Sequence, residues 1–212
     1  MTRQKLTKEN VSELAEETAN VLRRGYSAII PTDTLYGLAV DALSVDSIAH
    51  FFSIKKRPKN KPVPLFVKDI EMAKRLAFID KRQEEILTEL WPGPFTFVLR
   101  KKDSVNSTLS AGTEKIGLRI PNHIFIQALL YKLGRPITGS SANISGMDPG
   151  GDLDGIIEQF KENSIVPEYI VDAGKIKSGD PSTVIDITSQ EPKILRMNMT
   201  TLKKLNDIFG KI

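Results

Sequence analysis

The chain has 212 residues, of which 40% are hydrophobic and 26% are charged, and its formal net charge is +4 at pH 7. These values are ordinary for a globular protein of one domain, and they argue against a disordered chain. Cysteine is absent, which excludes thiol catalysis, zinc–thiolate sites and disulfide bonds. The small positive surplus favours anionic partners but falls short of the charge of a DNA-coating protein.

Further absences limit the class of protein. No apolar run approaches the roughly 20 residues that a membrane-spanning helix needs, and the N-terminal stretch MTRQKLTKEN lacks the apolar core of a secretory signal. The two histidines, His50 and His123, lie far apart in the sequence, so we expect no histidine-built metal site. We expect a cytoplasmic protein whose single domain spans residues 1–212.

Hydrophobic periodicity predicts helices that alternate with short strands. In chain order these are helix 11–24, strand 27–31, helix 44–57, strand 63–67, helices 69–79 and 81–91, strands 95–102 and 115–121, helix 122–134, a strand that begins at 136, helix 156–161, strands 169–174, 182–188 and 193–198, and helix 200–210. About seven strands mixed with about seven helices fit a single α/β sheet domain.

Polar loops follow several of the predicted strands. One of them, PTDTLYG at residues 31–37, lies where ligands bind in open α/β sheets, beyond the carboxyl end of a strand. The phosphate motifs GxxxxGK[ST] and GxGxxG are absent, as is the GxSxG motif of hydrolases. In strand 115–121 the side chain of Arg119 shares the polar face, opposite Ile116 and Leu118, so it is available to a ligand.

The tract KKRPKNKP, residues 55–62, places five cationic side chains within seven residues. Taken alone, the tract is most simply interpreted as a solvated helix end, because lysines there complement the helix dipole. A nuclear address is a weaker reading, since short basic runs match such signals by chance. A nucleic-acid contact and a cradle for the phosphates of a small molecule also fit this tract.

Six motifs occur together in one order: PTDTLYGLAVDA, KKRP, WPGPFTFVL, IGLRIPNH, SSANISG, and PSTVIDI followed by ILR. In this combination the chain resembles the YrdC family of threonylcarbamoyl-AMP synthases over about residues 15–200, in its short single-domain form. The resemblance implies an α/β fold with an open, twisted mixed β-sheet, flanking helices and a basic concave face.

The resemblance also implies a reaction. L-Threonine, bicarbonate and ATP would give threonylcarbamoyl-adenylate and pyrophosphate, a nucleotidyltransferase reaction and the first step of tRNA threonylcarbamoyladenosine modification. Mg²⁺ would accompany ATP and be held mainly by phosphates and water, with no metal site on the protein. Contact with tRNA or double-stranded RNA, and a downstream tRNA threonylcarbamoyl-transfer complex, would be further partners.

Site residues are carried over from the same motifs. Lys55, as a mobile point charge, and Arg57, as a solvent-facing bidentate donor, would be the catalytic pair at the phosphates. The residues implied for threonine are Thr34, Arg119, Ser141 and Ser182. The residues implied for ATP are Arg57, Lys61, Asn143, Gly151 and Arg196.

Simpler readings of these positions remain. Arg119 alone would read as a surface ion pair, and the serine-rich loop alone as an ordinary turn. The chain also departs from the family pattern, because Lys56 replaces a usual glycine and the histidine often found after strand 63–67 is missing. An RNA-binding protein of the same fold, or a paralogue with lost or altered activity, are therefore the alternatives.

Overall fold

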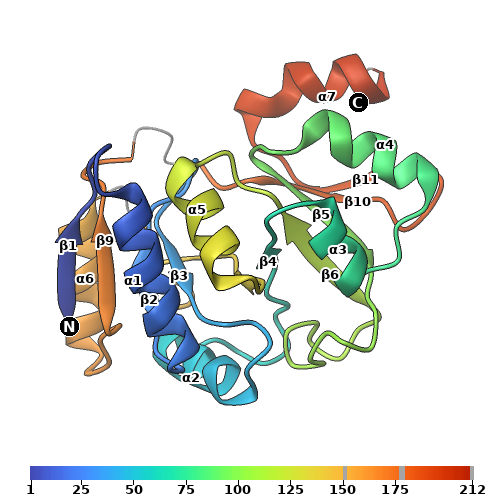
Figure 1. The fold of residues 1–212 in the computed structure, drawn as a ribbon. Coiled ribbons are helices and arrows are strands. Elements are labelled where there is room, and N and C mark those ends of the chain that lie inside the picture. The colour runs from blue at the N-terminus through green and yellow to red at the C-terminus, as the bar shows by residue number, and fades with distance from the viewer. Residues whose placement is uncertain (150–151, 177–179, 211–212) are drawn as a thin grey trace.

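The computed structural model describes residues 1–149, 152–176 and 180–210, and it contains two β-sheets with helices packed on them (Figure 1). Seven α-helices and eleven strands lie within these ranges. The predicted α/β class with mixed strand pairing is confirmed. The strands are divided between two sheets, however, whereas the sequence pattern suggested one.

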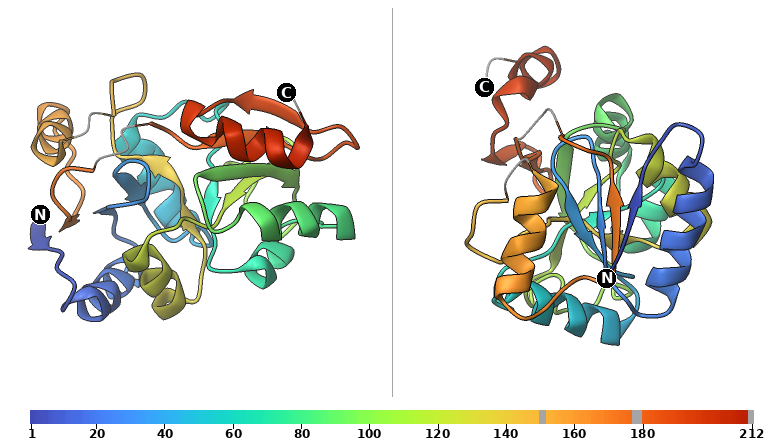
Figure 2. Two further views of the ribbon diagram at one scale, coloured as in Figure 1. Left: turned by 90° about the horizontal axis from the view of Figure 1, so that it is seen from above. Right: turned by 90° about the vertical axis from the view of Figure 1, so that its left-hand side faces the viewer.

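The first sheet has the order β1-β9-β2-β3-β8 and contains both parallel and antiparallel pairs. Its strands are β1 (Thr2–Lys5), β9 (Tyr169–Asp172), β2 (Ala28–Ile30), β3 (Gly37–Ala39) and β8 (Ser140–Ser141). Helices α1 (Val11–Arg23) and α5 (Ile124–Leu133) cover one face, and α2 (Val45–Lys55) and α6 (Leu153–Glu162) lie on the other. Figure 2 shows the strands between α1 and α6.

Burial on both faces explains the continuous apolar run of β2. Ile29 packs in the cluster that includes residues of α2 and α6, whereas Ala28 and Ile30 pack in the cluster of α1 and α5. A strand covered on both faces needs apolar side chains at every position and therefore shows no alternation.

The second sheet has the order β11-β10-β5-β6-β4-β7. Its strands are β11 (Lys193–Arg196), β10 (Thr183–Asp186), β5 (Phe95–Arg100), β6 (Lys115–Arg119), β4 (Leu65–Phe66) and β7 (Ile137–Thr138). Phe97, Leu118 and Ile185 point into the apolar core, to which α3 (Ile70–Leu76), α4 (Lys81–Leu90) and α7 (Leu202–Phe209) also contribute. The alternate residues of β5, β6 and β10 line a pocket instead. The predicted alternation of strand 115–121 is thus confirmed.

Strands β1 and β3 were not predicted from the sequence. The four residues of β1 are all exposed, so its pairing with β9 leaves no hydrophobic pattern. Strand β3 follows the polar PTDT turn and consists of Gly37–Ala39, which is too short for a periodic signal. Pairing with a strand distant in sequence, and not local propensity, defines both.

Helices α1 and α5 begin without a side-chain cap. Asn10 occupies the N-cap position of α1, but its side chain does not bond the helix; its Oδ1 accepts a hydrogen bond from the backbone N–H of Thr7 instead. The N-cap of α5 is His123, while Asn122 donates its backbone N–H to the carboxylate of Asp33. Within the described ranges, no helix combines the length and apolar character that crossing a bilayer requires.

The unusual Lys56 occupies the C-cap of α2 in a left-handed conformation, with φ 48°. A side chain in this region costs roughly 1–2 kcal/mol, which explains why glycine suits the position. We expect Lys56→Gly to raise the free energy of unfolding by about 0.5–1 kcal/mol, measured by urea denaturation. Lys59→Gly, at a residue without positive φ, is the control and should not stabilise; equal effects of the two changes would contradict the strain argument.

Candidate active site

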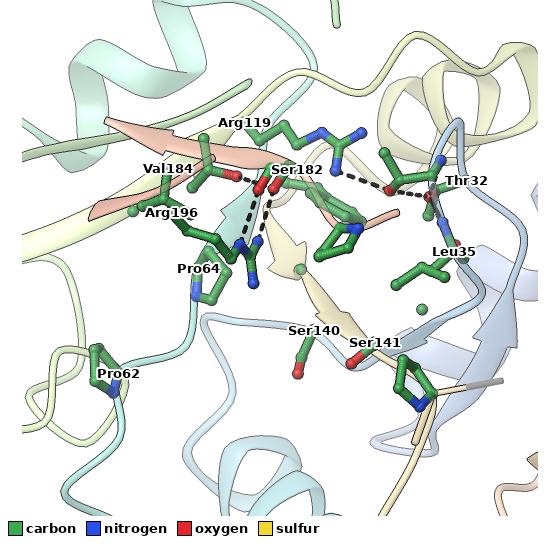
Figure 3. A pocket seen from close by; sticks show the side chains of 18 of the residues that line it. Thr32, Leu35, Pro62, Pro64, Arg119, Ser140, Ser141, Ser182, Val184 and Arg196 are labelled. Atoms are coloured by element: carbon green, nitrogen blue, oxygen red, sulfur yellow. Dashed lines mark hydrogen bonds between the residues drawn. The ribbon is translucent and has the colours of Figure 1, made fainter. Parts of the chain in front are cut away.

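A pocket of about 450 Å³ lies between the two sheets. This volume is within the range of small-molecule sites, roughly 300–1,000 Å³. The β2–β3 loop and β8 form one wall, and strands β4, β5, β6, β10 and β11 contribute the other. In Figure 3 Ser140 and Ser141 lie across the cavity from Ser182 and Arg119.

Six of the residues implied by the sequence motifs line this pocket: Thr34, Arg57, Arg119, Ser141, Ser182 and Arg196. They come from segments as far apart as the β2–β3 loop and β11, so the fold alone brings them together. Lys55, Lys61 and Asn143 are described by the structure but do not line the pocket. Gly151 lies outside the described residues.

Arg119 forms a fixed cation on the floor of the pocket. Its side chain is 3% exposed, and the Nε donates to the carbonyl oxygen of Gly93 at 3.0 Å. One terminal nitrogen donates to the Thr34 hydroxyl at 3.1 Å, and the other donates to the carboxylate of Asp33. The guanidinium also lies 5.6 Å from the centre of the Phe66 ring. The simple reading as a surface ion pair is therefore wrong, because the pair with Asp33 is buried.

These three contacts do not use all the N–H groups of Arg119. A guanidinium has five N–H groups, and three are used within the protein, so two remain for a carboxylate or phosphate in the pocket. Burial lowers the pKa of Arg119, and the charge of Asp33 opposes that shift. An arginine stays protonated at any physiological pH, so the pocket floor holds a permanent positive charge.

The PTDT segment serves as both a turn and a pocket wall. Thr32 Oγ1 accepts hydrogen bonds from the backbone N–H groups of Thr34 at 3.0 Å and Leu35 at 3.2 Å, which closes a turn of the type that threonine favours. The hydroxyls of Thr32 and Thr34 are also 3.0 Å apart. Thr34 thus stands between Thr32 and Arg119, with its hydroxyl held at the pocket wall.

Lys55 is buried beside the pocket, whereas the motif suggested a mobile charge. Its side chain is 2% exposed, and Nζ donates to the carbonyl oxygens of Ser141 at 2.6 Å and Asn143 at 2.8 Å. A third bond reaches Asn143 Oδ1 at 2.9 Å. All three ammonium protons are therefore used to hold the end of β8 and the loop that follows it, and a direct phosphate contact by Lys55 stays a prediction.

Asn143 is used in the same internal network. Its Oδ1 accepts from Lys55 and from the Ser141 hydroxyl at 2.7 Å, and its Nδ2 donates to the carbonyl oxygens of Ile144 and Met147. The SSANISG loop is thus more than an ordinary turn, because buried side chains fix it. Contact between Asn143 and ATP stays a prediction.

The environment of Lys55 predicts a pH dependence of stability. Burial, and secondarily the charge of Arg57, lowers the pKa of Lys55 from 10.5 to about 7. Between these values the unfolded chain binds a proton that the folded protein has released, so the free energy of unfolding should rise with pH through this window. Below pH 7 both states are protonated and the full cost of burying the charge is felt.

The measurement is denaturant unfolding of the wild type and Lys55→Met from pH 6 to 10. The wild type should gain a few kcal/mol relative to the variant, because all other groups titrate in both proteins and cancel. A difference that stays constant with pH would mean that the three oxygen acceptors keep the ammonium charged throughout.

Ser182 and Arg196 form a second polar group at the pocket. Arg196 Nε donates to the Ser182 carbonyl oxygen at 2.9 Å, and a terminal nitrogen donates to the Ser182 hydroxyl at 3.2 Å (Figure 3). The same hydroxyl pairs with Thr96 at 2.8 Å. The pKa of Arg196 is lowered by partial burial and by the positive charge of Arg119, so the two cations act on the same cavity.

Arg57 lines the pocket but is half-buried, which corrects the expectation that it faces solvent. Its Nε donates to the Lys61 carbonyl oxygen at 3.2 Å, and a terminal nitrogen donates to that of Pro62 at 2.6 Å. Three of its N–H groups remain for a ligand, and burial lowers its pKa. Lys61 meets this site through its main chain, with an exposed side chain.

Several site residues were not assigned from the sequence. In the sequence, Asp33 belongs to the PTDTLYG loop, Gly93 to the WPGPFTFVL motif, and Phe66 to the apolar strand 63–67. The motifs PTDT and WPGP mark the first two as turns but say nothing about a contact with Arg119. No local signal distinguishes Phe66 from a core aromatic.

Comparison with known proteins gives the family. The sequence profile of the Sua5/YciO/YrdC family, described as "Telomere recombination", matches residues 20–197. The chain belongs to this family. The resemblance seen in the six sequence motifs is thereby confirmed.

Related proteins support the assignment. A threonylcarbamoyl-AMP synthase of Pyrococcus abyssi is 32% identical over 209 residues, which cover 96% of this chain and 61% of that protein. A Methanocaldococcus jannaschii protein, provisionally given the same name, is 30% identical and is matched over 93% of its length. The chain thus spans about three fifths of the first relative and nearly all of the second.

Two solved structures resemble the fold. The crystal structure of P. abyssi Sua5 complexed with L-threonine superimposes with a TM-score of 0.88 at 30% identity, over 100% of this chain and 60% of that one. Escherichia coli YciO gives a TM-score of 0.80 at 23% identity, over 93% of this chain and 94% of that one, and supports the fold alone.

Proposed function

We propose that this chain joins L-threonine, bicarbonate and ATP into threonylcarbamoyl-AMP and releases pyrophosphate. The observation that carries the proposal is the pocket, in which the buried Arg119–Thr34 pair faces the same cavity as Arg57 and Arg196. One fixed cation suits an amino-acid carboxylate, and two further arginines suit a triphosphate. Family membership and the names of the relatives support the same activity.

The amino acid would bind at the floor of the pocket. The two unused N–H groups of Arg119 offer a bidentate site for its carboxylate, and the neighbouring hydroxyls of Thr34 and Ser182 offer partners for its polar groups. Because Arg119 is already held from three directions, the carboxylate meets a preorganised partner and little side-chain freedom is lost on binding.

The chemistry would need positioning and charge neutralisation more than a nucleophile from the protein. The free threonine amine forms an N–C bond with carbon dioxide, which bicarbonate supplies by losing hydroxide. The proton that the amine loses converts this hydroxide to water, and a carbamate remains. A carbamate oxygen then forms a bond to the α-phosphorus while the bond to pyrophosphate breaks. Arg57 and Arg196 would neutralise charge on the phosphates during this displacement, in a site partly shielded from water.

Mg²⁺ would enter with ATP. The described residues that line the pocket include no aspartate or glutamate, so the ion would be held by phosphate oxygens and water. Its chemistry when bound is to neutralise phosphate charge, and the proposed residue roles do not otherwise depend on it.

We further propose that the product serves tRNA threonylcarbamoyladenosine modification in the cytoplasm, through a downstream transfer complex. RNA binding is the second candidate function, because Lys59 and Lys61 of the basic tract are exposed beside the pocket-lining Arg57. Such binding would rest on phosphate contacts, so it should weaken steeply as salt concentration rises.

Mass spectrometry of the protein with ATP, Mg²⁺, bicarbonate and L-threonine tests the proposal. Threonylcarbamoyl-AMP and pyrophosphate should appear together and vanish when threonine or bicarbonate is omitted. ATP binding without either product would favour a paralogue with lost or altered activity. Salt-dependent RNA binding without turnover would favour the second candidate.

A further inference from the structure

Asp33 has no contact with the pocket cavity itself, yet it holds the residue that defines the pocket floor. Its side chain is 13% exposed, and one carboxylate oxygen accepts from a terminal nitrogen of Arg119. The other oxygen accepts from the backbone N–H of Asn122 at 3.0 Å. Asp33 therefore joins the β2–β3 loop to both the end of β6 and the start of the segment leading into α5.

From this arrangement we propose that Asp33 is a positioning residue for the substrate carboxylate, acting through Arg119. The inference rests on the proposed function of Arg119 as the carboxylate site. Without Asp33, the guanidinium would keep its bonds to Gly93 and Thr34 but lose the charged partner that fixes its rotation. Geometric fit of a bidentate arginine–carboxylate pair depends on that rotation.

The opposing electrostatic effect makes the proposal testable. A carboxylate beside Arg119 lowers the positive potential that an incoming anion meets. If charge alone decided affinity, neutralising Asp33 would strengthen the attraction between Arg119 and the substrate carboxylate and so tighten binding. If orientation decides it, the same change weakens binding, because the free energy of a hydrogen bond to a charged group depends on its alignment.

The test is Asp33→Asn, which preserves side-chain size and one acceptor. We expect the Kd of L-threonine, measured by isothermal titration calorimetry, and the KM for L-threonine to rise about 10- to 100-fold, the fold-change expected for a misaligned charged hydrogen bond. The KM for ATP should stay within about twofold of the wild-type value, since Asp33 acts at the threonine carboxylate and not at the phosphates of ATP. Asp33→Glu, which keeps the charge but moves it, should not restore binding.

Asp186→Asn is the matched control. Asp186 accepts from Lys115 at 2.7 Å, so it pairs with a cation on the same strand as Arg119, and neither residue lines the pocket. This variant should bind L-threonine like the wild type. In an Arg119→Gln background, Asp33→Asn should cause no further loss, because the residue it positions is gone.

The outcomes distinguish a failure of the proposed function from a failure of the positioning role of Asp33. If the wild type does not bind L-threonine, the proposed function fails. If the wild type binds it and Asp33→Asn binds equally well or more tightly, the positioning role is wrong. Additive losses in the double variant would also overturn it, since Asp33 would then act by a route independent of Arg119.

Discussion

Arg57→Gln should lower kcat/KM for threonylcarbamoyl-AMP formation by about 10²- to 10³-fold, the usual loss when one donor to transition-state charge is removed. The guanidinium of Arg57 reaches the pocket with three unused N–H groups, and glutamine has neither its charge nor its reach. The measurement is the rate of pyrophosphate release as the ATP concentration is varied, with threonine and bicarbonate saturating, so that kcat/KM refers to ATP.

The stability of Arg57→Gln and the turnover of a second variant, Lys59→Gln, serve as controls for this experiment. Arg57 is half-buried and bonds the main chain of Lys61 and Pro62, so the variant should lose about 1 kcal/mol of unfolding free energy and remain folded at assay temperature. Lys59→Gln removes a positive charge from the same tract at an exposed residue and should keep near-normal turnover. Equal losses in both variants would indicate general electrostatic attraction and would refute a specific contact by Arg57.

Lys55→Met should be the most damaging single change to this site. It removes the donor shared by the carbonyl oxygens of Ser141 and Asn143 and by Asn143 Oδ1, and an unsatisfied buried polar group costs about 1–3 kcal/mol. Removal of a buried charge offsets part of this loss, so we expect a net destabilisation of about 2–4 kcal/mol near pH 6 to 7. Turnover should fall at least as far as in Arg57→Gln, since Ser141 would lose its place at the pocket.

Hydrogen exchange of the loop that Lys55 holds distinguishes this structural role. Hydrogen exchange should increase in residues 141–147 of Lys55→Met, while the exchange of α4, on the far face of the second sheet, stays unchanged. Lys161→Met, at an exposed lysine of α6, is the control and should change neither exchange nor turnover. Unchanged protection in residues 141–147 would show that the loop holds its shape without Lys55.

Local pattern was enough for most of the fold. The helices α2 and α4 and the strands β5 and β6 follow from periodicity and capping residues, because each element's own side chains carry the signal. The opposite orientation of Leu118 and Arg119 in β6 follows from the two-residue repeat of a strand. Strand β1 could not be predicted in this way, since its exposed TRQK residues owe their conformation to β9.

For the candidate site, sequence motifs indicated which residues matter, and packing decided how each is used. The motifs placed Arg119 and Lys55 at the site through family resemblance. They gave no account of the partners, because Asp33 lies 86 residues before Arg119, and the main contacts of Lys55 lie 86 and 88 residues ahead of it. Whether a cation reaches the ligand or holds the structure depends on such distant partners.

The sequence by itself determined the α/β class, the family and the basic, oxygen-rich character of the site, because these depend on composition, local periodicity and ordered motifs. The tertiary structure alone decided that the strands form two sheets, that the pocket lies between them, and that Lys55 is buried while Arg57 and Arg196 face the cavity. The physical reason is that strand pairing, burial and hydrogen-bond partners are set by contacts between residues far apart in the chain, which no local pattern encodes.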